Sequence, residues 1–212
     1  MQGVVLDCGS GMCRAGLAGD PDPSVVFSSV VGRPAERPRM TAPGQKHLYV
    51  GPSAQARRGI LHLNYPIQHG IITNWDDMEL IWQHALEELH TSPEEHPILL
   101  TEAPLNPRSN REKIVQVLFE SFNVPACYVA LEGLLSLFVT VRSTGVVLQV
   151  GEGCCSTLAI CEGQTSERCA RRMDLGGREL SEFLGRLLGE RGYALGTGAE
   201  MEVAREIKEK EC

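Results

Sequence analysis

Short apolar runs separated by polar breaks dominate the beginning of the chain. Residues 4–6 form an apolar run, residues 9–11 interrupt it with glycines, and residues 12–18 resume it. A glycine turn between two such runs predicts a β-hairpin. The β-branched run at residues 25–31 predicts a further strand. Residues 33–44 carry three prolines and scattered charges, which predicts an exposed loop.

Longer segments with helical spacing alternate with short apolar runs through the middle of the chain. Residues 74–90 place apolar side chains three and four positions apart, and the acids in their first turns suit the positive end of a helix dipole. A second helix is predicted to begin at Asn110 and to end before Pro125. The other elements predicted here are strands at residues 97–101 and 127–131 and a buried helix at residues 133–140.

The last third of the chain is again rich in strands and then turns helical. Strands are predicted at residues 145–150, 156–162 and 167–174, and helices at residues 177–191 and 199–210. Alternation of strands with helices of this length predicts an α/β fold with a mixed or parallel sheet. We expect two lobes, residues 1–140 and 141–212. The second is expected to be incomplete, because no strand is predicted after its last helix.

Composition limits the classes of function. The 212 residues are 42% hydrophobic, enough for one large or two modest cores, and the net charge of −7 argues against general attraction to nucleic acids or anionic lipids. The eight cysteines form no C-x-x-C pair, so we expect reduced thiols. The histidines other than His69 lack metal-ligand spacing, so no metal site built from side chains alone is expected. No signal peptide or membrane span is predicted, and we expect neither a membrane nor a direct nucleic-acid partner.

Two turns about 140 residues apart have nearly the same sequence. Asp7-Cys8-Gly9-Ser10-Gly11-Met12 follows the first apolar run, and Gln149-Val150-Gly151-Glu152-Gly153-Cys154 follows a similar run in the second lobe. A glycine turn of this kind can present backbone N–H groups to an anion. We therefore expect two similar lobes to face each other across a cleft and to hold a polyphosphate between their turns.

These turns, together with longer matched runs, resemble actin and the actin-related proteins. The runs are DCGSGMCRAG at residues 7–16, YPIQHGIITNWDD at 65–77, PEEHPILLTEAPLNP at 93–107 and IKEK at 207–210, within a match that continues from Val4 to Cys212. Ordered runs of this length are far more specific than a single G-x-G turn. The resemblance implies the two-lobed, ribonuclease-H-like fold of actin and the heat-shock-chaperone ATPases. It also implies a small outer subdomain at residues 29–65. By this resemblance, the chain corresponds to a little over half of an actin.

The resemblance further implies a cleft for ATP or ADP with Mg²⁺ or Ca²⁺. Ser10, Gly11 and Met12 match phosphate contacts, and Asp7 matches the carboxylate that holds the water shell of the cation. Arg14 stands where the family usually has lysine, which keeps the charge but changes the geometry. The remaining implied contacts are Gly151, Glu152, Gly153 and Cys154 of the second turn, and Gly177, Arg205, Lys208 and Glu209 around the base and ribose, with Asp174 nearby. Without the resemblance, residues 205–209 would be an ordinary solvated, charged helix face.

The residues implied in hydrolysis depart from the family pattern. Gln149 replaces an aspartate near the cation, Glu152 replaces an aspartate in the second turn, and Glu132 and Ser156 replace the glutamine and histidine that orient the attacking water. Phosphoryl transfer depends on positioning and charge, so these changes predict slow or absent hydrolysis. An ionised Glu132 about 4 Å from a polyphosphate would be repelled by about 4 kcal/mol at an effective dielectric near 20.

Three functions stay open at this point. We expect an actin-like structural or assembly protein that uses any bound nucleotide to stabilise its fold. The alternatives are an active, polymerising ATPase of the actin type and a truncated product without independent activity. Expected partners are actin-like or cytoskeletal proteins, and the expected location is the cytoplasm and cytoskeleton, with the nucleus as the alternative. The rewritten segment at residues 33–44 argues against copolymerisation with actin.

Overall fold

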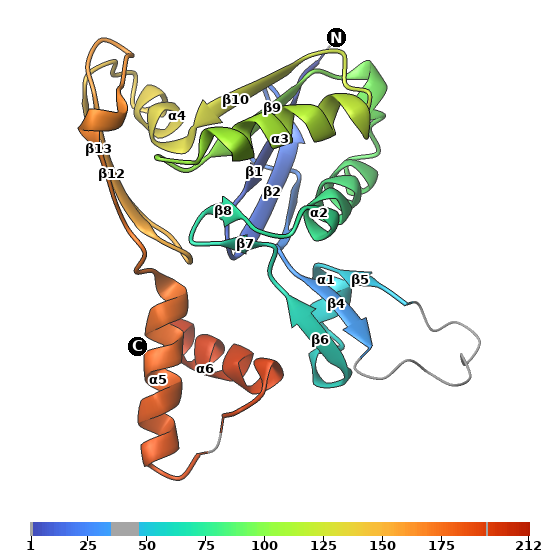
Figure 1. The fold of residues 1–212 in the computed structure, drawn as a ribbon, viewed down its shortest axis with the longest axis vertical. Helices are drawn as coiled ribbons and strands as arrows, with labels where there is room; N and C mark the ends of the chain where they lie inside the picture. Colours follow the sequence, from blue (N-terminus) through green and yellow to red (C-terminus); the bar gives the residue numbers. More distant parts are fainter. Residues whose placement is uncertain (1, 35–46, 194) are drawn as a thin grey trace.

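Figure 1 shows the computed structural model, which describes residues 2–34, 47–193 and 195–212. A five-stranded sheet organises the first part of the chain, in the order β10-β9-β1-β2-β3. Its strands are β1 (Val4–Cys8), β2 (Met12–Leu17), β3 (Val25–Ser28), β9 (Ile98–Glu102) and β10 (Cys127–Leu131). Strand β1 pairs antiparallel with β2 and parallel with β9, so the predicted α/β fold with a mixed sheet is confirmed.

The largest core lies between this sheet and two helices, α2 (Trp75–Glu88) and α3 (Arg108–Glu120). Helix α2 begins where the sequence predicts, because the side chain of Asn74 accepts a hydrogen bond from the backbone of Asp77 at 3.1 Å. Its apolar stripe, which includes the fully buried Trp82, packs on the sheet. Helix α3 begins two residues before the predicted Asn110, because the backbone N–H of Asn110 already bonds to Pro107 at 3.0 Å.

A small subdomain projects from the first sheet. It contains β4 (Val31–Pro34), β5 (Tyr49–Val50), α1 (Pro52–Gln55), the 3₁₀ turn η1 (Arg58–Ile60) and β6 (Leu61–Asn64), with strand order β5-β4-β6. The prediction of one strand at residues 25–31 is wrong. The chain turns sharply after Ser28, whose carbonyl accepts from Val30 N at 2.8 Å, and β3 and β4 join different sheets.

The predicted loop at residues 33–44 is also wrong at its start, because Arg33 and Pro34 belong to β4. The guanidinium of Arg33 bonds to the fully buried carboxylate of Asp77, one of the acids predicted to face the helix dipole. This ion pair fixes the end of β4 against α2. The rest of the predicted loop lies outside the described residues.

A second, three-stranded sheet has the order β11-β12-β13, with β11 (Gly145–Val150), β12 (Cys155–Ile160) and β13 (Ala170–Met173). Strand β13 is shorter than predicted, because a 3₁₀ turn, η3 (Glu167–Cys169), precedes it. Helix α4 (Glu132–Val139) contributes Leu137 to the core of this sheet, although the predicted boundary at residue 140 assigned it to the first lobe. Its end is not buried as predicted, since Phe138 and Val139 are exposed.

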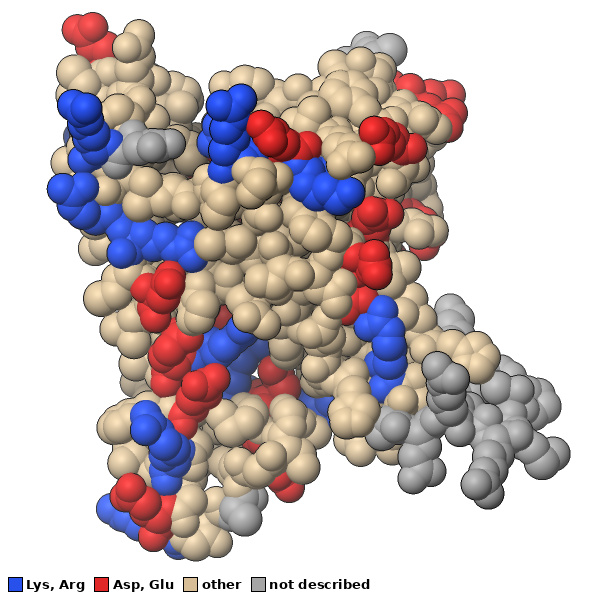
Figure 2. All heavy atoms as spheres, viewed as in Figure 1, with Lys and Arg blue, Asp and Glu red and all other residues tan. Residues whose placement is uncertain are grey.

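The remaining elements connect these parts. They are β7 (Ile67–Gln68), β8 (Ile71–Ile72), the 3₁₀ turn η2 (Pro93–Glu95), α5 (Gly177–Glu190) and α6 (Gly198–Glu211). Helices α5 and α6 pack against each other below the second sheet (Figure 1). On the face drawn in Figure 2, acidic and basic side chains are interspersed. Across the described ranges, no helix has the length and apolar character needed to cross a bilayer.

Candidate functional site

The two glycine turns fold in the same way. In the first, Gly9 N donates to Met12 O at 2.9 Å, and in the second, Gly151 N donates to Cys154 O at 3.0 Å. Each of these bonds closes an antiparallel hairpin, β1–β2 in the first lobe and β11–β12 in the second. The sequence repeat therefore corresponds to two equivalent hairpins, one in each sheet.

The tips of these turns are in contact with each other. A Cβ built on Gly153 would lie 2.2 Å from Ser10 Oγ, and a Cβ on Gly11 would lie 2.9 Å from Cγ of Glu152. Ser10 Oγ is fixed in place because it accepts a hydrogen bond from Gly70 N at 2.9 Å. Glycine is thus required at the tips by the close approach of the two lobes.

Backbone donors at the tips are available to a ligand. In the part of the chain that the structure describes, no group accepts from the N–H of Ser10, Gly11, Glu152 or Gly153. Clustered N–H groups in a glycine turn attract anions such as phosphate. The arrangement of close glycines and unpaired donors therefore fits a polyphosphate.

The segment after β7 supports both turns. His69, which has a left-handed backbone with φ of 48°, places Nδ1 2.7 Å from Gly153 O. The guanidinium of Arg172 in β13 donates to the carbonyl of His69. This segment connects the two lobes directly behind the turns, a role that the spacing of the histidines does not indicate.

The residues predicted for the site, with the exception of Asp174, line one cleft of about 590 Å³, a volume typical of ligand pockets. They are Asp7, Ser10, Gly11, Met12, Arg14, Glu132, Gln149, Gly151, Glu152, Gly153, Cys154, Ser156, Gly177, Arg205, Lys208 and Glu209. Asp174 instead pairs with Arg172 at 3.0 Å. Gly9, Gly70, Ala103, Val150 and Leu180 also line the cleft. The first four lie within the turns and matched runs but have no predicted role, and Leu180 has no motif that marks it.

Asp7 lies at the base of this cleft. Thr101 Oγ1 donates to its Oδ1 at 2.7 Å, and Arg14 Nη1 lies 3.4 Å from its Oδ2. The carboxylate keeps free lone pairs, which suits a hard cation that retains water. Within the described ranges, no group of three or more His, Cys, Asp or Glu side chains could ligate a metal. A cation here would therefore depend on water and on a bound phosphate for most of its ligands.

Glu132 and Gln149 form a pair beside Asp7. Gln149 Nε2 lies 3.4 Å from Glu132 Oε2. Burial raises the pKa of Glu132 from its ordinary value of 4.5 to about 7; the charge of Asp7 adds to this effect, and Arg14 opposes it. The single side-chain oxygen of Gln149, Oε1, is buried and has no partner among the described residues. This part of the cleft therefore holds a carboxyl group that changes charge near neutral pH.

The opposite wall of the cleft comes from helices α5 and α6. Lys208 Nζ donates to Gly177 O at 2.7 Å and lies 4.0 Å from Glu152 Oε2. Burial raises the pKa of Glu152, while Lys208 and Arg205 oppose that rise. Arg205 also pairs with Glu209 at 3.0 Å. These cations face the cleft, so residues 205–209 are not the solvated helix face that their sequence alone would suggest.

Side-chain contacts join the small subdomain to α6 of the second lobe. Arg58 Nη1 lies 2.5 Å from Glu206 Oε1, and Gln55 Nε2 donates to Glu202 at 3.2 Å. The hydroxyl of Tyr65 donates to the same carboxylate of Glu202. Burial raises the pKa of Tyr65, and the hydrogen bond to Glu202 raises it further. The sequence contains no signal for these contacts, because the partners lie in distant segments.

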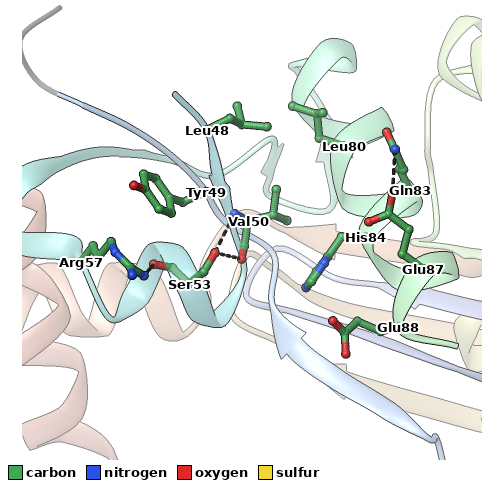
Figure 3. Close-up of a pocket in the computed structure, with 10 residues that line it drawn as sticks. All are labelled: Leu48, Tyr49, Val50, Ser53, Arg57, Leu80, Gln83, His84, Glu87 and Glu88. Carbon is green, nitrogen blue, oxygen red and sulfur yellow. Dashed lines mark hydrogen bonds between the residues drawn. The ribbon is translucent and has the colours of Figure 1, made fainter. Parts of the chain in front are cut away.

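A second cavity of about 650 Å³ lies between the small subdomain and α2, where Figure 3 shows its lining side chains. Leu48 and Val50 face Leu80 of α2 across it, whereas the ring of Tyr49 points away from Leu80. Gln83 and Glu87 bond to each other at its rim. None of the residues predicted for the site lines this cavity, and it contains neither glycine turn, so it is not the functional candidate.

The fold and the cleft define a class: a two-lobed α/β protein in which paired hairpin turns meet at the base of a cleft. Comparison with known protein families agrees with this architecture. The family model described as Actin matches residues 1–212. The chain belongs to the actin family, and the predicted resemblance and fold class are confirmed.

Proposed function

We propose that this chain is an actin-like structural or assembly protein that binds ATP or ADP with Mg²⁺ or Ca²⁺ and hydrolyses the nucleotide slowly or not at all. The observation that supports binding best is the meeting of two equivalent glycine turns with unpaired N–H groups at their tips. The altered residues beside them support the loss of hydrolysis. Actin-like or cytoskeletal partners and a location in the cytoplasm and cytoskeleton belong to the same proposal and rest on family membership.

The glycine turns would bind the phosphates of the nucleotide, and the cations of α6 would lie near its nucleoside. The N–H groups of Ser10 and Gly11 would donate to the terminal phosphates from one lobe, and those of Glu152 and Gly153 from the other. Asp7 would hold the water shell of the cation, which neutralises phosphate charge when bound. The cations of α6, at residues 205 and 208, would face the nucleoside side of the cleft.

Hydrolysis needs a group that orients and deprotonates water. Ser156 has a hydroxyl of low basicity, and Gln149 has a neutral amide. Glu132 is the remaining candidate, but it becomes a base only when ionised, and its negative charge then repels the phosphates. The two requirements conflict, so the cleft favours nucleotide retention over turnover.

Nucleotide binding is tested by titrating the full chain with a fluorescent ATP analogue, in Mg²⁺ and in Ca²⁺. Gly153→Ala is expected to lose binding, because its Cβ would collide with Ser10 Oγ at 2.2 Å. Gly189→Ala is the matched control, since its Cβ meets nothing within 4 Å. Equal binding by both variants, or none by the wild-type chain, would refute the proposed cleft.

Hydrolysis is tested separately by phosphate release under single-turnover conditions. The wild-type chain is expected to retain ATP without releasing phosphate at the rate of an active actin measured in parallel. Replacing Glu132 with Gln, Gln149 with Asp and Ser156 with His together restores the family residues and is expected to increase release. A wild-type rate equal to that of actin would overturn the hydrolysis proposal and leave the binding proposal intact.

A further inference from the structure

Two cysteines face each other directly behind the first glycine turn. Cys8 is the last residue of β1 and Cys13 is the second residue of β2, and the register of the two strands places them opposite each other. Opposed residues of an antiparallel pair direct their side chains to the same face of the sheet. Both cysteines are free thiols, so two sulfurs lie next to each other across this hairpin.

The hydrogen bonds of the hairpin bring this pair close together. Gly9 N donates to Met12 O at 2.9 Å, and Ala18 N donates to Gly3 O at 2.8 Å, so the hydrogen-bonded pairs fall on the odd-numbered residues of β1. The cysteine pair therefore lies at a position without hydrogen bonds, where opposed Cα atoms are about 4.5 Å apart. A disulfide joins Cα atoms about 4.4–6.8 Å apart. The backbone thus already holds the two thiols within the span of a disulfide.

The surroundings of the pair keep the thiols reduced under ordinary conditions. Cys13 is fully buried, and Cys8 packs against the same core. A hydrogen bond with Cys13, followed by burial, raises the pKa of Cys8. Thiolate is therefore scarce at neutral pH, and reaction with an oxidant is slow. Only an oxidant small enough to enter the core can reach these sulfurs.

A small cavity beside Cys8 gives such an oxidant a place to bind. Its volume is about 30 Å³. A water molecule needs about 10–15 Å³, so this cavity has room for a molecule with two oxygen atoms. Gly9, Gly70 and Ala103 line both this cavity and the large cleft, and they present almost no side chain as a barrier between the two. Hydrogen peroxide fits this cavity, whereas glutathione disulfide is far too large for it.

We propose that Cys8 and Cys13 form an intramolecular disulfide when the protein meets hydrogen peroxide, and that this bond fixes the first glycine turn. The Cys8 sulfur attacks one peroxide oxygen, the O–O bond breaks, and the leaving hydroxide takes the thiol proton to form water. The Cys13 sulfur then attacks the resulting sulfenic acid, the S–S bond forms, and the hydroxide that leaves takes the second thiol proton. Two thiols lose two protons and two electrons, and the peroxide is reduced to two waters. Cys8 reacts first because it lines the cavity. This inference does not depend on nucleotide binding.

Mass spectrometry of a tryptic digest tests the bond. Arg14 is the first Lys or Arg of the chain, so residues 1–14 form one peptide that holds both cysteines and no other. The folded full chain is incubated with hydrogen peroxide, then unfolded and alkylated. Peptide 1–14 is expected to lose about 2 Da and to take up no alkylating reagent until dithiothreitol reduces it.

Cys127 is the matched control within the same digest. It is partly buried, its pKa is also raised by burial, and it is the single cysteine of peptide 114–142. Without a neighbouring thiol in its peptide, it should stay open to alkylation. If peptide 1–14 stays open to alkylation in the folded chain, if Cys127 is protected equally, or if dithiothreitol does not reverse the protection, the disulfide is refuted.

Two further measurements test the order of the reaction and its effect on the turn. Cys13→Ser should leave Cys8 as a sulfenic acid, which dimedone traps at least about tenfold more than in the wild-type chain. If this variant folds poorly, the wild-type digest still decides the question. In the oxidised wild-type chain, amide exchange at residues 9–13 should slow severalfold, because the bond lies next to the pair that closes the turn. Equal trapping in both chains would overturn the order of attack, and unchanged exchange would overturn the effect on the turn.

Discussion

Replacing Glu132 with Gln should make the folded protein more stable at alkaline pH and leave it nearly unchanged at acidic pH. The pKa of this carboxyl is raised from 4.5 to about 7, chiefly by burial. The folded state therefore favours the protonated form. The stability that this preference contributes is fully present below pH 4.5 and is lost as the pH rises through about 7.

The size of the effect follows from the difference between the two pKa values. Each pKa unit corresponds to about 1.36 kcal/mol, so a rise from 4.5 to about 7 gives an upper bound of about 3.4 kcal/mol. The Glu132 side chain is not completely removed from solvent, and screening reduces this bound to about 2 kcal/mol. The neutral amide of glutamine resembles the protonated acid and avoids the cost of burying a charge.

The assay is urea denaturation of the wild-type chain and Glu132→Gln at a series of pH values from about 5 to 8.5. The difference in the free energy of unfolding between the two should grow by about 2 kcal/mol across this interval. Glu182→Gln, at an exposed position of α5, serves as the control and should show a small and nearly constant difference. A difference that is independent of pH for Glu132→Gln would refute the assignment of the buried carboxyl as the titrating group.

Other contacts give predictions for the same measurement, the free energy of unfolding in urea. Asp77→Ala should lower it by about 2–3 kcal/mol, because the buried carboxylate that binds Arg33 is lost. Tyr65→Phe should lower it by about 1–2 kcal/mol and speed amide exchange in α6, since the hydroxyl that donates to Glu202 of α6 is removed. Gly51→Ala should cost about 2 kcal/mol, because φ is +56° there and the added Cβ would lie 2.7 Å from the ring of Phe27. A variant as stable as the wild-type chain would contradict the contact assigned to it.

Local pattern was sufficient to predict most elements and their order. The helix predicted at residues 74–90 is α2, because its apolar spacing and the cap at Asn74 act within one segment. The strand predicted at residues 25–31 failed for the opposite reason. Its β-branched residues divide at Ser28 and Ser29 between two different sheets, and a one-dimensional pattern cannot distinguish burial in one sheet from burial in two.

The sequence by itself determined the paired glycine turns, the family and most of the residues that line the cleft, because long ordered matches and short turns are properties of contiguous chain. Only the tertiary structure decided how those residues meet: that Glu132 lies beside Gln149, 17 positions away, and that Tyr65 reaches Glu202, 137 positions away. Burial and charge at such contacts come from segments that pack together only after the sheets form. Neither the raised pKa of Glu132 nor the contact between the small subdomain and α6 therefore has a signature in local sequence.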